Sequence, residues 1–222
     1  MLLLNIDTAI DKGSFCISRN NEVIAFEMTE SRNEQAGWLH EAIHHSFQQN
    51  GLDFRELDAV AVSNGPGSYT GLRIGLSTAK GLCYALNKPL ICLNTLQIIA
   101  AAAESQARRY ICPMIDARRM EVFTALFDKN LVPVKEPFAM ILNEESFSDI
   151  LKEDHIIFTG NGSGKFRSLI KDNVNAEIVE RNIDARNMID LSLKNYQEKN
   201  FSDVAYCEPY YVKDVYISKK EI

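Results

Sequence analysis

Two aspartates follow short apolar segments at equivalent places in the two halves of the chain. Asp7 ends LLLNID, and Asp116 ends YICPMID. A carboxylate at a strand end could position a magnesium ion beside a phosphate. Ala9 and Ile10 stand where glycines would let a phosphate approach the first loop, and the second loop, DARRME, contains no glycine. We interpret each aspartate either as part of a degenerate phosphate-binding cleft or as a strand-end cap bonded to turn amides.

Several residues near these aspartates complete the candidate cleft. Two arginines follow Asp116, and guanidinium groups suit phosphate, although a solvated turn is the alternative. The segment GNGSGKF is similar to a Walker A loop, but Thr159 and Phe166 replace its first glycine and its hydroxyl residue. The candidate cleft residues are Asp7, Thr8, Asp116, Arg118, Arg119, Gly160 and Gly162.

The segment SNGPGSYTGLRIGLSTAKGL, residues 63–82, joins a predicted strand to a predicted helix. Backbone amides at such a junction could bind an anion. However, the spacing matches neither GxGxxG nor Walker A, and Pro66 removes one amide donor. Small residues recur at every fourth position of the helix, which predicts close packing on the chain's own sheet or on a partner. This small-residue strip is Gly71, Gly75, Ala79 and Cys83.

The histidines and cysteines suggest other chemistry less strongly. HEAIH, residues 40–44, matches the HExxH pattern of zinc hydrolases. Such a site needs a third ligand, and the remaining histidines are His45 and His155. We therefore predict exposed or interface histidines and no metal site. The five cysteines include no CxxC pair, so we predict buried thiols in a reducing compartment.

Composition restricts the class of protein. The chain has 222 residues, a net charge of −6 and a pI near 5.3, which argues against nucleic-acid binding by the chain alone. The apolar start MLLL is too short for a signal peptide, and no stretch reaches the roughly 18 apolar residues of a membrane span. We expect a cytoplasmic protein with no membrane contact.

Periodicity predicts the elements that position these residues. In the first half, strands are expected at 2–7, 13–20, 22–28, 57–65 and 89–93, with helices at 34–49, 71–86 and 95–109. In the second half, strands are expected at 110–116, 121–128, 137–142 and 155–160, with helices at 144–152, 165–171 and 183–197.

This order predicts an α/β protein of two ribonuclease H-like lobes, with mixed sheets flanked by helices as in actin-like (ASKHA) ATPases. The first lobe is expected to span residues 1–105. Residues 106–222 are expected to form an abbreviated second lobe, with a C-terminal tail that packs back toward the first.

Four segments together resemble the TsaB family, also called YeaZ, of the Gcp-like (M22 glycoprotease-like) superfamily. They are NIDTA, the segment 63–82, MIDARRMEVFTALFD and EPYYVKD. The family loop corresponds to Gly65, Pro66, Gly67, Ser68 and Gly71. The resemblance implies a role in tRNA threonylcarbamoyladenosine (t6A) synthesis, beside the catalytic subunit TsaD. TsaD transfers threonylcarbamoyl to N6 of adenosine 37 in tRNAs that read ANN codons.

The resemblance also implies that this chain is not itself catalytic. The metal-binding histidine pair of TsaD would fall at Thr95 and Ile99, and neither side chain can ligate a metal in that way. We therefore expect no catalytic residue and no required cofactor in this chain, with ATP and Mg²⁺ acting only at the level of the complex.

The expected partners are TsaD and TsaE, with tRNA bound only through the complex and a homodimer when the chain is alone. The family's contact surface would use the helices at 34–49 and 71–86. Candidate contacts are Leu39, Ile43, Leu72, Gly75, Leu76 and Ala79. The alternatives are an actin-like nucleotide hydrolase or kinase that uses Asp7 and Asp116, and a metal-dependent glycoprotease-like peptidase.

Overall fold

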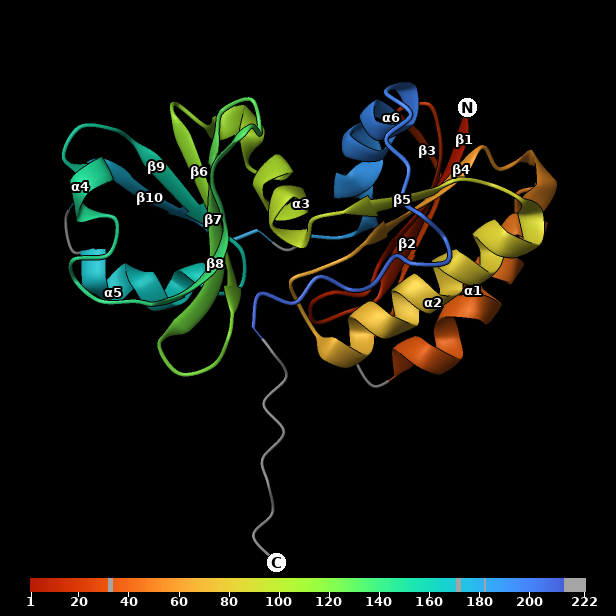
Figure 1. Ribbon diagram of the computed structural model, residues 1–222, viewed down its shortest axis with the longest axis horizontal. Helices are drawn as coiled ribbons and strands as arrows, with labels where there is room; N and C mark the ends of the chain where they lie inside the picture. Colours follow the sequence, from red (N-terminus) through yellow and green to blue (C-terminus); the bar gives the residue numbers. More distant parts are fainter. Residues whose placement is uncertain (32–33, 171–172, 182, 214–222) are drawn as a thin grey trace, which may run out of the picture.

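The computed structural model describes residues 1–31, 34–170, 173–181 and 183–213, and within them the chain forms two five-stranded mixed sheets (Figure 1). The strand orders are β3-β2-β1-β4-β5 and β8-β7-β6-β9-β10. Each order begins with an antiparallel hairpin and continues with parallel strands, so the two lobes share one topology. The predicted pair of ribonuclease H-like lobes is confirmed.

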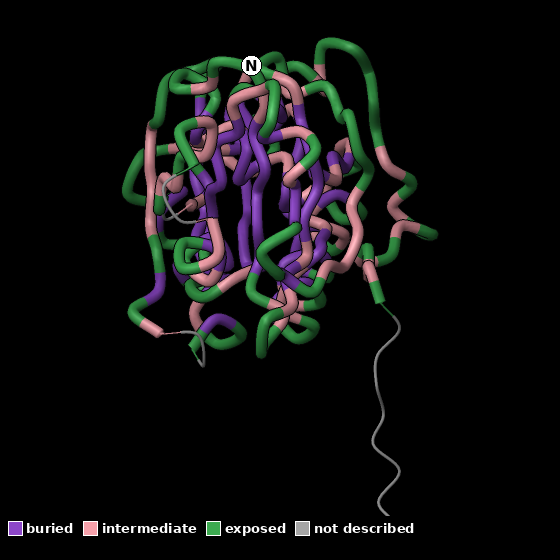
Figure 2. The backbone as a smooth tube through the Cα atoms, turned by 90° about the vertical axis from the view of Figure 1, so that its left-hand side faces the viewer, coloured by how far each residue is buried: buried purple, intermediate pink, exposed green. Residues whose placement is uncertain are grey.

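The first sheet is built from a hairpin followed by strands that are connected through helices. β1 is the central strand, and every one of its residues is buried because both faces of the sheet are covered. The strands are β1 (Leu2–Asp7), β2 (Ser14–Arg19), β3 (Glu22–Met28), β4 (Ala59–Ser63) and β5 (Leu90–Leu93). Figure 2 shows buried residues concentrated along the central strands and exposed residues around them.

Helices α1 (Gln35–Gln49) and α2 (Tyr69–Leu86) lie together on one face of this sheet (Figure 1). Leu39, Ile43 and Phe47, spaced four residues apart, are buried against the sheet as their periodicity predicts. The N-cap of α1 is Glu34, which makes no side-chain cap hydrogen bond.

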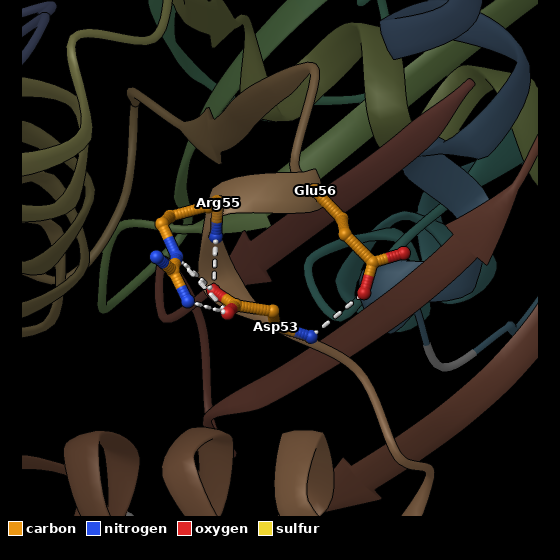
Figure 3. Close-up of polar contacts among 3 residues, drawn as sticks. All are labelled: Asp53, Arg55 and Glu56. Carbon is orange, nitrogen blue, oxygen red and sulfur yellow. Dashed lines mark hydrogen bonds and ion pairs between the residues drawn. The ribbon is translucent and has the colours of Figure 1, made fainter.

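A short 3-10 turn, η2 (Phe54–Glu56), leads the chain from α1 into β4. Its capping box is drawn in Figure 3: the Asp53 carboxylate accepts a hydrogen bond from the Arg55 amide, and the Glu56 carboxylate accepts one from the Asp53 amide. The Arg55 side chain also pairs with Asp53, and this hydrogen bond lowers the pKa of Asp53 to about 2.

The second sheet repeats the plan with shorter covering helices. Its strands are β6 (Tyr110–Asp116), β7 (Glu121–Asp128), β8 (Pro133–Ile141), β9 (Ile156–Thr159) and β10 (Ala176–Val179). The predicted helix at 144–152 contracts to α4 (Ser148–Leu151). The one at 165–171 becomes a 3-10 turn, η4 (Ser163–Phe166), and one turn of helix, α5 (Arg167–Ile170); Lys171 lies outside the described residues.

The two lobes exchange helices, which the sequence did not indicate. Helix α3 (Thr95–Ala101), followed by η3 (Glu104–Gln106), packs on β6 and β7 of the second sheet. Conversely, η5 (Ala185–Met188) and α6 (Ile189–Gln197) pack on β1 and β5 of the first sheet. The first sheet ends with β5 and the second begins with β6, and α6, within the helix predicted at 183–197, packs on the first sheet.

After α6 the chain crosses the first lobe toward the second, and we call residues 202–213 the strap (Figure 1). The Ser202 amide donates to the Leu90 carbonyl over 2.8 Å, and the Tyr210 amide donates to the Asn64 carbonyl over 2.7 Å. At its end Lys213 pairs with Glu121 of β7. The described part of the tail therefore contacts the first lobe through Ser202 and Tyr210 and the second lobe through Lys213. Within the described parts of the chain, no helix is long and apolar enough to cross a membrane.

Candidate functional site

Asp7, at the end of β1, is turned into the first lobe. Its side chain is buried, and its Oδ1 accepts hydrogen bonds from Ser63 Oγ over 2.6 Å and from the Ala9 amide over 3.1 Å. Burial raises the pKa of Asp7, and these two hydrogen bonds offset part of the rise. The carboxyl group thus joins the ends of β1 and β4, as the strand-end cap interpretation expects.

The Thr8 side chain is also used for packing inside the first lobe. Its Oγ1 donates to the Gly71 carbonyl of α2 over 2.7 Å, and the residue is fully buried. The small-residue strip of α2 lies against this loop: a Cβ on Gly71 would overlap the Thr8 carbonyl oxygen, and one on Gly75 would overlap Thr8 Oγ1. Of the two uses that the sequence allowed for the small-residue strip, packing within the chain or packing on a partner, the structure shows the first.

Three neighbouring segments contact the Gly-Pro-Gly loop: the start of α3, the strap and the loop after β1. The Gly65 amide donates to Thr95 Oγ1 over 3.1 Å, and the Thr95 amide donates to the Gly65 carbonyl over 2.8 Å. Gly65 has φ +115°, and a Cβ there would overlap the Tyr210 carbonyl oxygen of the strap. The Ser68 amide donates to the Ala9 carbonyl over 2.6 Å. These amides bind protein oxygens, so the loop is built as a packing junction.

Asp116, at the end of β6, has a different environment from Asp7. Its Oδ1 accepts from the Arg118 amide and from Lys165 Nζ, both over 2.6 Å, and its side chain is 42% exposed. Partial burial opposes ionisation, but Lys165 and the Arg118 amide together hold the pKa of Asp116 below its usual value. Lys165 lies 49 positions away in the Walker-like segment, so sequence spacing did not indicate this pairing.

The predicted glycines lie beside this second strand end. Gly160 has φ +95°, and a Cβ on Gly162 would meet the Asp116 amide at 3.0 Å, so both allow the loop after β9 to approach β6. Between them Asn161 accepts from the Asp116 amide over 3.0 Å and donates to Asp11 of the first lobe over 3.4 Å. Asn161 and Asp11 were missed by sequence reasoning, because their contact depends on how the lobes meet.

Two cavities lie where the lobes meet. One, of about 280 Å³, is lined by residues that include Gly67, Ser68, Asp116, Arg118 and Asn161. The other, of about 270 Å³, is lined by residues that include Asp7, Asp11, Lys12, Gly160 and Arg181. Both mix acidic and basic groups, so neither forms a uniformly positive cradle for phosphate. Arg118 lines the first cavity, whereas Arg119 lines neither and is exposed on the turn.

The residues predicted as partner contacts require a correction. All of these residues are buried in the core of the first lobe, because their helical spacing marks the face that packs on the sheet. They are Leu39, Ile43, Leu72, Gly75, Leu76 and Ala79. The exposed faces of α1 and α2 instead border a shallow hollow of about 480 Å³. We call it the α1/α2 hollow; it is lined by Ala36, His40, Tyr69, Thr70, Arg73, Ile74, Ser77 and Thr78.

The HEAIH histidines do not converge on one point. His40 Nε2 lies 3.2 Å from Thr78 Oγ1, whereas His44 stacks on Phe54 with ring centroids 6.3 Å apart. Across the described residues, no three His, Cys, Asp or Glu side chains gather at metal-ligand distance.

Comparison with known proteins identifies the family of this chain. The family model TsaD, described as tRNA N6-adenosine threonylcarbamoyltransferase, matches residues 29–214. The chain belongs to the TsaB (YeaZ) branch of the TsaD family. It is 29% identical to the TsaB of Bacillus subtilis over 178 residues, covering 78% of this chain and 76% of that protein. It is 26% identical to the TsaB of Escherichia coli, covering 99% and 98%.

A solved structure agrees with the branch by fold. A Pseudomonas aeruginosa protein, titled as similar to peptidase YEAZ, superimposes with a TM-score of 0.83 at 19% identity, covering 96% of this chain and 99% of that one. The TsaB relatives are described as tRNA threonylcarbamoyladenosine biosynthesis proteins. This TsaB-branch chain is accordingly a protein of t6A biosynthesis.

Proposed function

We propose that this chain is a non-catalytic subunit that binds a TsaD-type transferase and supports threonylcarbamoyl transfer to adenosine 37 of tRNAs that read ANN codons. It acts in the cytoplasm, with TsaE as a further partner and tRNA reached only through the complex. The chain itself needs no cofactor; ATP and Mg²⁺ act at the level of the complex.

The two strand-end carboxylates carry this proposal. In a phosphate-handling cleft, they would have to be ionised and open to a cation. Asp7 is instead buried against Ser63 with its pKa raised, and Asp116 is already neutralised by Lys165 at 2.6 Å. The positions of the catalytic histidine pair are likewise occupied by structural side chains: Thr95 bonds to Gly65, and Ile99 is fully buried.

The α1/α2 hollow supports the choice of contact surface. It combines aliphatic surface from Ile74 and Ala36 with the Arg73 guanidinium, which lies 4.0 Å from the centre of the Tyr69 ring. A mixed apolar and aromatic–arginine surface on rigid helices suits a protein partner. The same surface would be shared by TsaD and by a second copy of this chain, which predicts that TsaD binding competes with a homodimer.

The proposal is tested by reconstituting transfer from purified components. The chain alone should transfer no threonylcarbamoyl group, and activity should appear when TsaD, a TsaC-type synthase and TsaE are added. Ser77→Arg places a charged side chain in the α1/α2 hollow at an exposed helix position. It should weaken TsaD binding by about tenfold or more, because interface burial of an unpaired charge costs at least about 1.4 kcal/mol.

Gln49→Arg is the matched control, since it adds the same charge at an exposed position of α1 outside the hollow. It should leave TsaD binding unchanged. Transfer by the chain alone would refute the non-catalytic role, and equal binding by both variants would refute the surface. Calorimetry with ATP and Mg²⁺ separates the nucleotide-hydrolase alternative, because the isolated chain should show no micromolar binding.

A further inference from the structure

Two cysteines far apart in the sequence meet at the edge of the first lobe. Cys92 lies in β5 and Cys207 lies in the strap, and their Sγ atoms are 2.9 Å apart. Both are free thiols and both are partly exposed. The remaining cysteines are buried in the lobe cores; they are Cys16, Cys83 and Cys112. The prediction of buried thiols therefore holds for these three and not for the pair.

Backbone contacts hold both members of the pair in place. The Cys92 amide donates to Ser202 Oγ over 3.3 Å, and the Cys207 amide donates to the Asp203 carbonyl over 2.9 Å. Lys80 of α2 donates to the carbonyl oxygens of Ala205 and Cys207 over 3.1 and 3.0 Å. The sulfurs are thus brought together by a fixed framework, and forming a bond of about 2.05 Å requires them to move together by only about 1 Å.

The strap contacts the Gly-Pro-Gly loop and the first turn of α2. Beyond Cys207, the Glu208 carbonyl accepts from the Asn64 side chain over 3.1 Å, and the Tyr210 carbonyl oxygen fills the space that a side chain on Gly65 would take. Next, the Tyr211 ring packs on Tyr69 at 5.4 Å between centroids. The strap therefore covers the Gly-Pro-Gly loop and the start of α2. A covalent bond at Cys207 would hold this cover on the loop.

We propose that Cys92 and Cys207 form a redox-reactive dithiol whose disulfide fixes the strap over the Gly-Pro-Gly loop. The inference does not depend on the proposed function, because it rests on the position of the two sulfurs and on the strap's own contacts.

The oxidant is a low-molecular-weight disulfide such as oxidised glutathione, and the step is two successive thiol–disulfide exchanges. The Cys207 thiolate attacks one sulfur of the external disulfide, which forms a mixed disulfide and expels one thiolate. The Cys92 thiolate then attacks Cys207 Sγ and expels the second. The protein loses two electrons and two protons, and the external disulfide becomes two thiols.

This order of attack follows from the surroundings of the two sulfurs. Burial raises the pKa of Cys92 to about 12, so Cys92 is a poor first nucleophile in solution. As the resolving thiol it acts within the molecule, where its position beside Cys207 compensates for a small thiolate fraction. Burial likewise raises the pKa of Cys16, Cys83 and Cys112 to about 12, which disfavours competing exchanges at those sites.

The test titrates the full chain in glutathione buffers from reducing to oxidising, followed by an acid quench, intact mass measurement and peptide mapping. An oxidised protein lighter by about 2 Da, with Cys92 linked to Cys207 in one peptide pair, is the expected result. Amide exchange at Ser202 and Tyr210 should slow on the order of tenfold, because opening of the strap is restricted.

Cysteine variants provide the matched controls. Cys207→Ser should abolish the loss of 2 Da, and Cys92→Ser should stop at the mixed disulfide on Cys207, whereas Cys112→Ala should still oxidise normally. Peptide mapping of the unmodified sequence decides the proposal even if a variant does not fold. A disulfide that joins any other pair, or no disulfide in the oxidising buffer, overturns it; unchanged amide exchange in the oxidised chain overturns the fixing of the strap.

Discussion

At the scale of single residues, Asp7 and Asp116 occupy equivalent strand ends but have opposite pKa shifts. Burial in the first lobe favours the protonated form of Asp7, whereas Lys165 and a turn amide favour the ionised form of Asp116. Duplicated topology therefore does not imply duplicated chemistry. The contacts that follow each strand, Ser63 in one lobe and Lys165 in the other, set the charge of each carboxyl group.

Asparagine variants should show this difference as opposite dependences of stability on pH. The folded pKa of Asp7 is raised above its unfolded value, so the parent protein loses stability as pH rises from the unfolded pKa to the folded pKa. Asparagine cannot ionise, so the Asp7→Asn variant should avoid this loss and become more stable relative to the parent as pH rises through the same range. Asp116 stabilises the fold above its unfolded pKa, and this contribution is lost as pH falls through its lowered folded pKa.

Asp116→Asn should therefore lose stability at neutral pH, by less than about 1 kcal/mol because the pair is partly exposed. Urea unfolding measured from well below the unfolded aspartate pKa of about 3.9 up to neutral pH tests both variants. The same sign of pH dependence in the two variants would contradict the opposite environments described for the carboxyl groups.

At the scale of elements, the small residues of helix α2 differ in what they pack against. Gly71 and Gly75 face Thr8, whereas Gly81 is exposed, and a Cβ on Gly81 would point into open space. Glycine lowers helix propensity in every one of these places. Only at the first two does close packing on the loop after β1 compensate for that cost.

Alanine substitutions within this one helix should separate the two effects. Gly75→Ala should lower the free energy of unfolding by about 1–3 kcal/mol, because its Cβ overlaps Thr8 Oγ1. Gly81→Ala should raise it by roughly 0.5–1 kcal/mol through helix propensity alone. Urea unfolding at neutral pH gives both values, and a neutral Gly75→Ala would show that the close approach does not matter for stability.

At the scale of the whole molecule, the exchange of helices ties the lobes together. Helix α3 leaves the first lobe to cover the second sheet, and α6 returns to cover the first. Each core therefore contains chain from both halves, and the strap adds the contact between Lys213 and Glu121. Neither lobe can form its complete core until the helix contributed by the other half of the chain has packed on it.

This arrangement predicts a single cooperative unfolding transition. Trp38, the one tryptophan of the sequence, lies in α1 and reports on the first lobe, whereas far-ultraviolet circular dichroism reports on both. The two signals should change at the same urea concentration, because exchanged helices couple the cores. A tryptophan transition at a different urea concentration from the dichroism transition would show that the lobes unfold independently.

Much of the fold of this protein could be predicted from its sequence alone. Buried strands such as LLLNID, the hairpin after it and the amphipathic stripe of α1 follow from local periodicity, and their repetition predicts two similar lobes. Edge elements were less predictable: β10 is only four residues long, and the first residues of β8 are exposed and include a proline and charged side chains.

Tertiary structure decided which surfaces and which side chains meet. The periodicity of α1 and α2 marked their apolar faces, but only the fold shows that those faces cover their own sheet and leave the α1/α2 hollow exposed. The pairs Asp116–Lys165 and Cys92–Cys207 join residues 49 and 115 positions apart. Such contacts depend on how the lobes, the exchanged helices and the strap pack, which no local pattern of residues encodes.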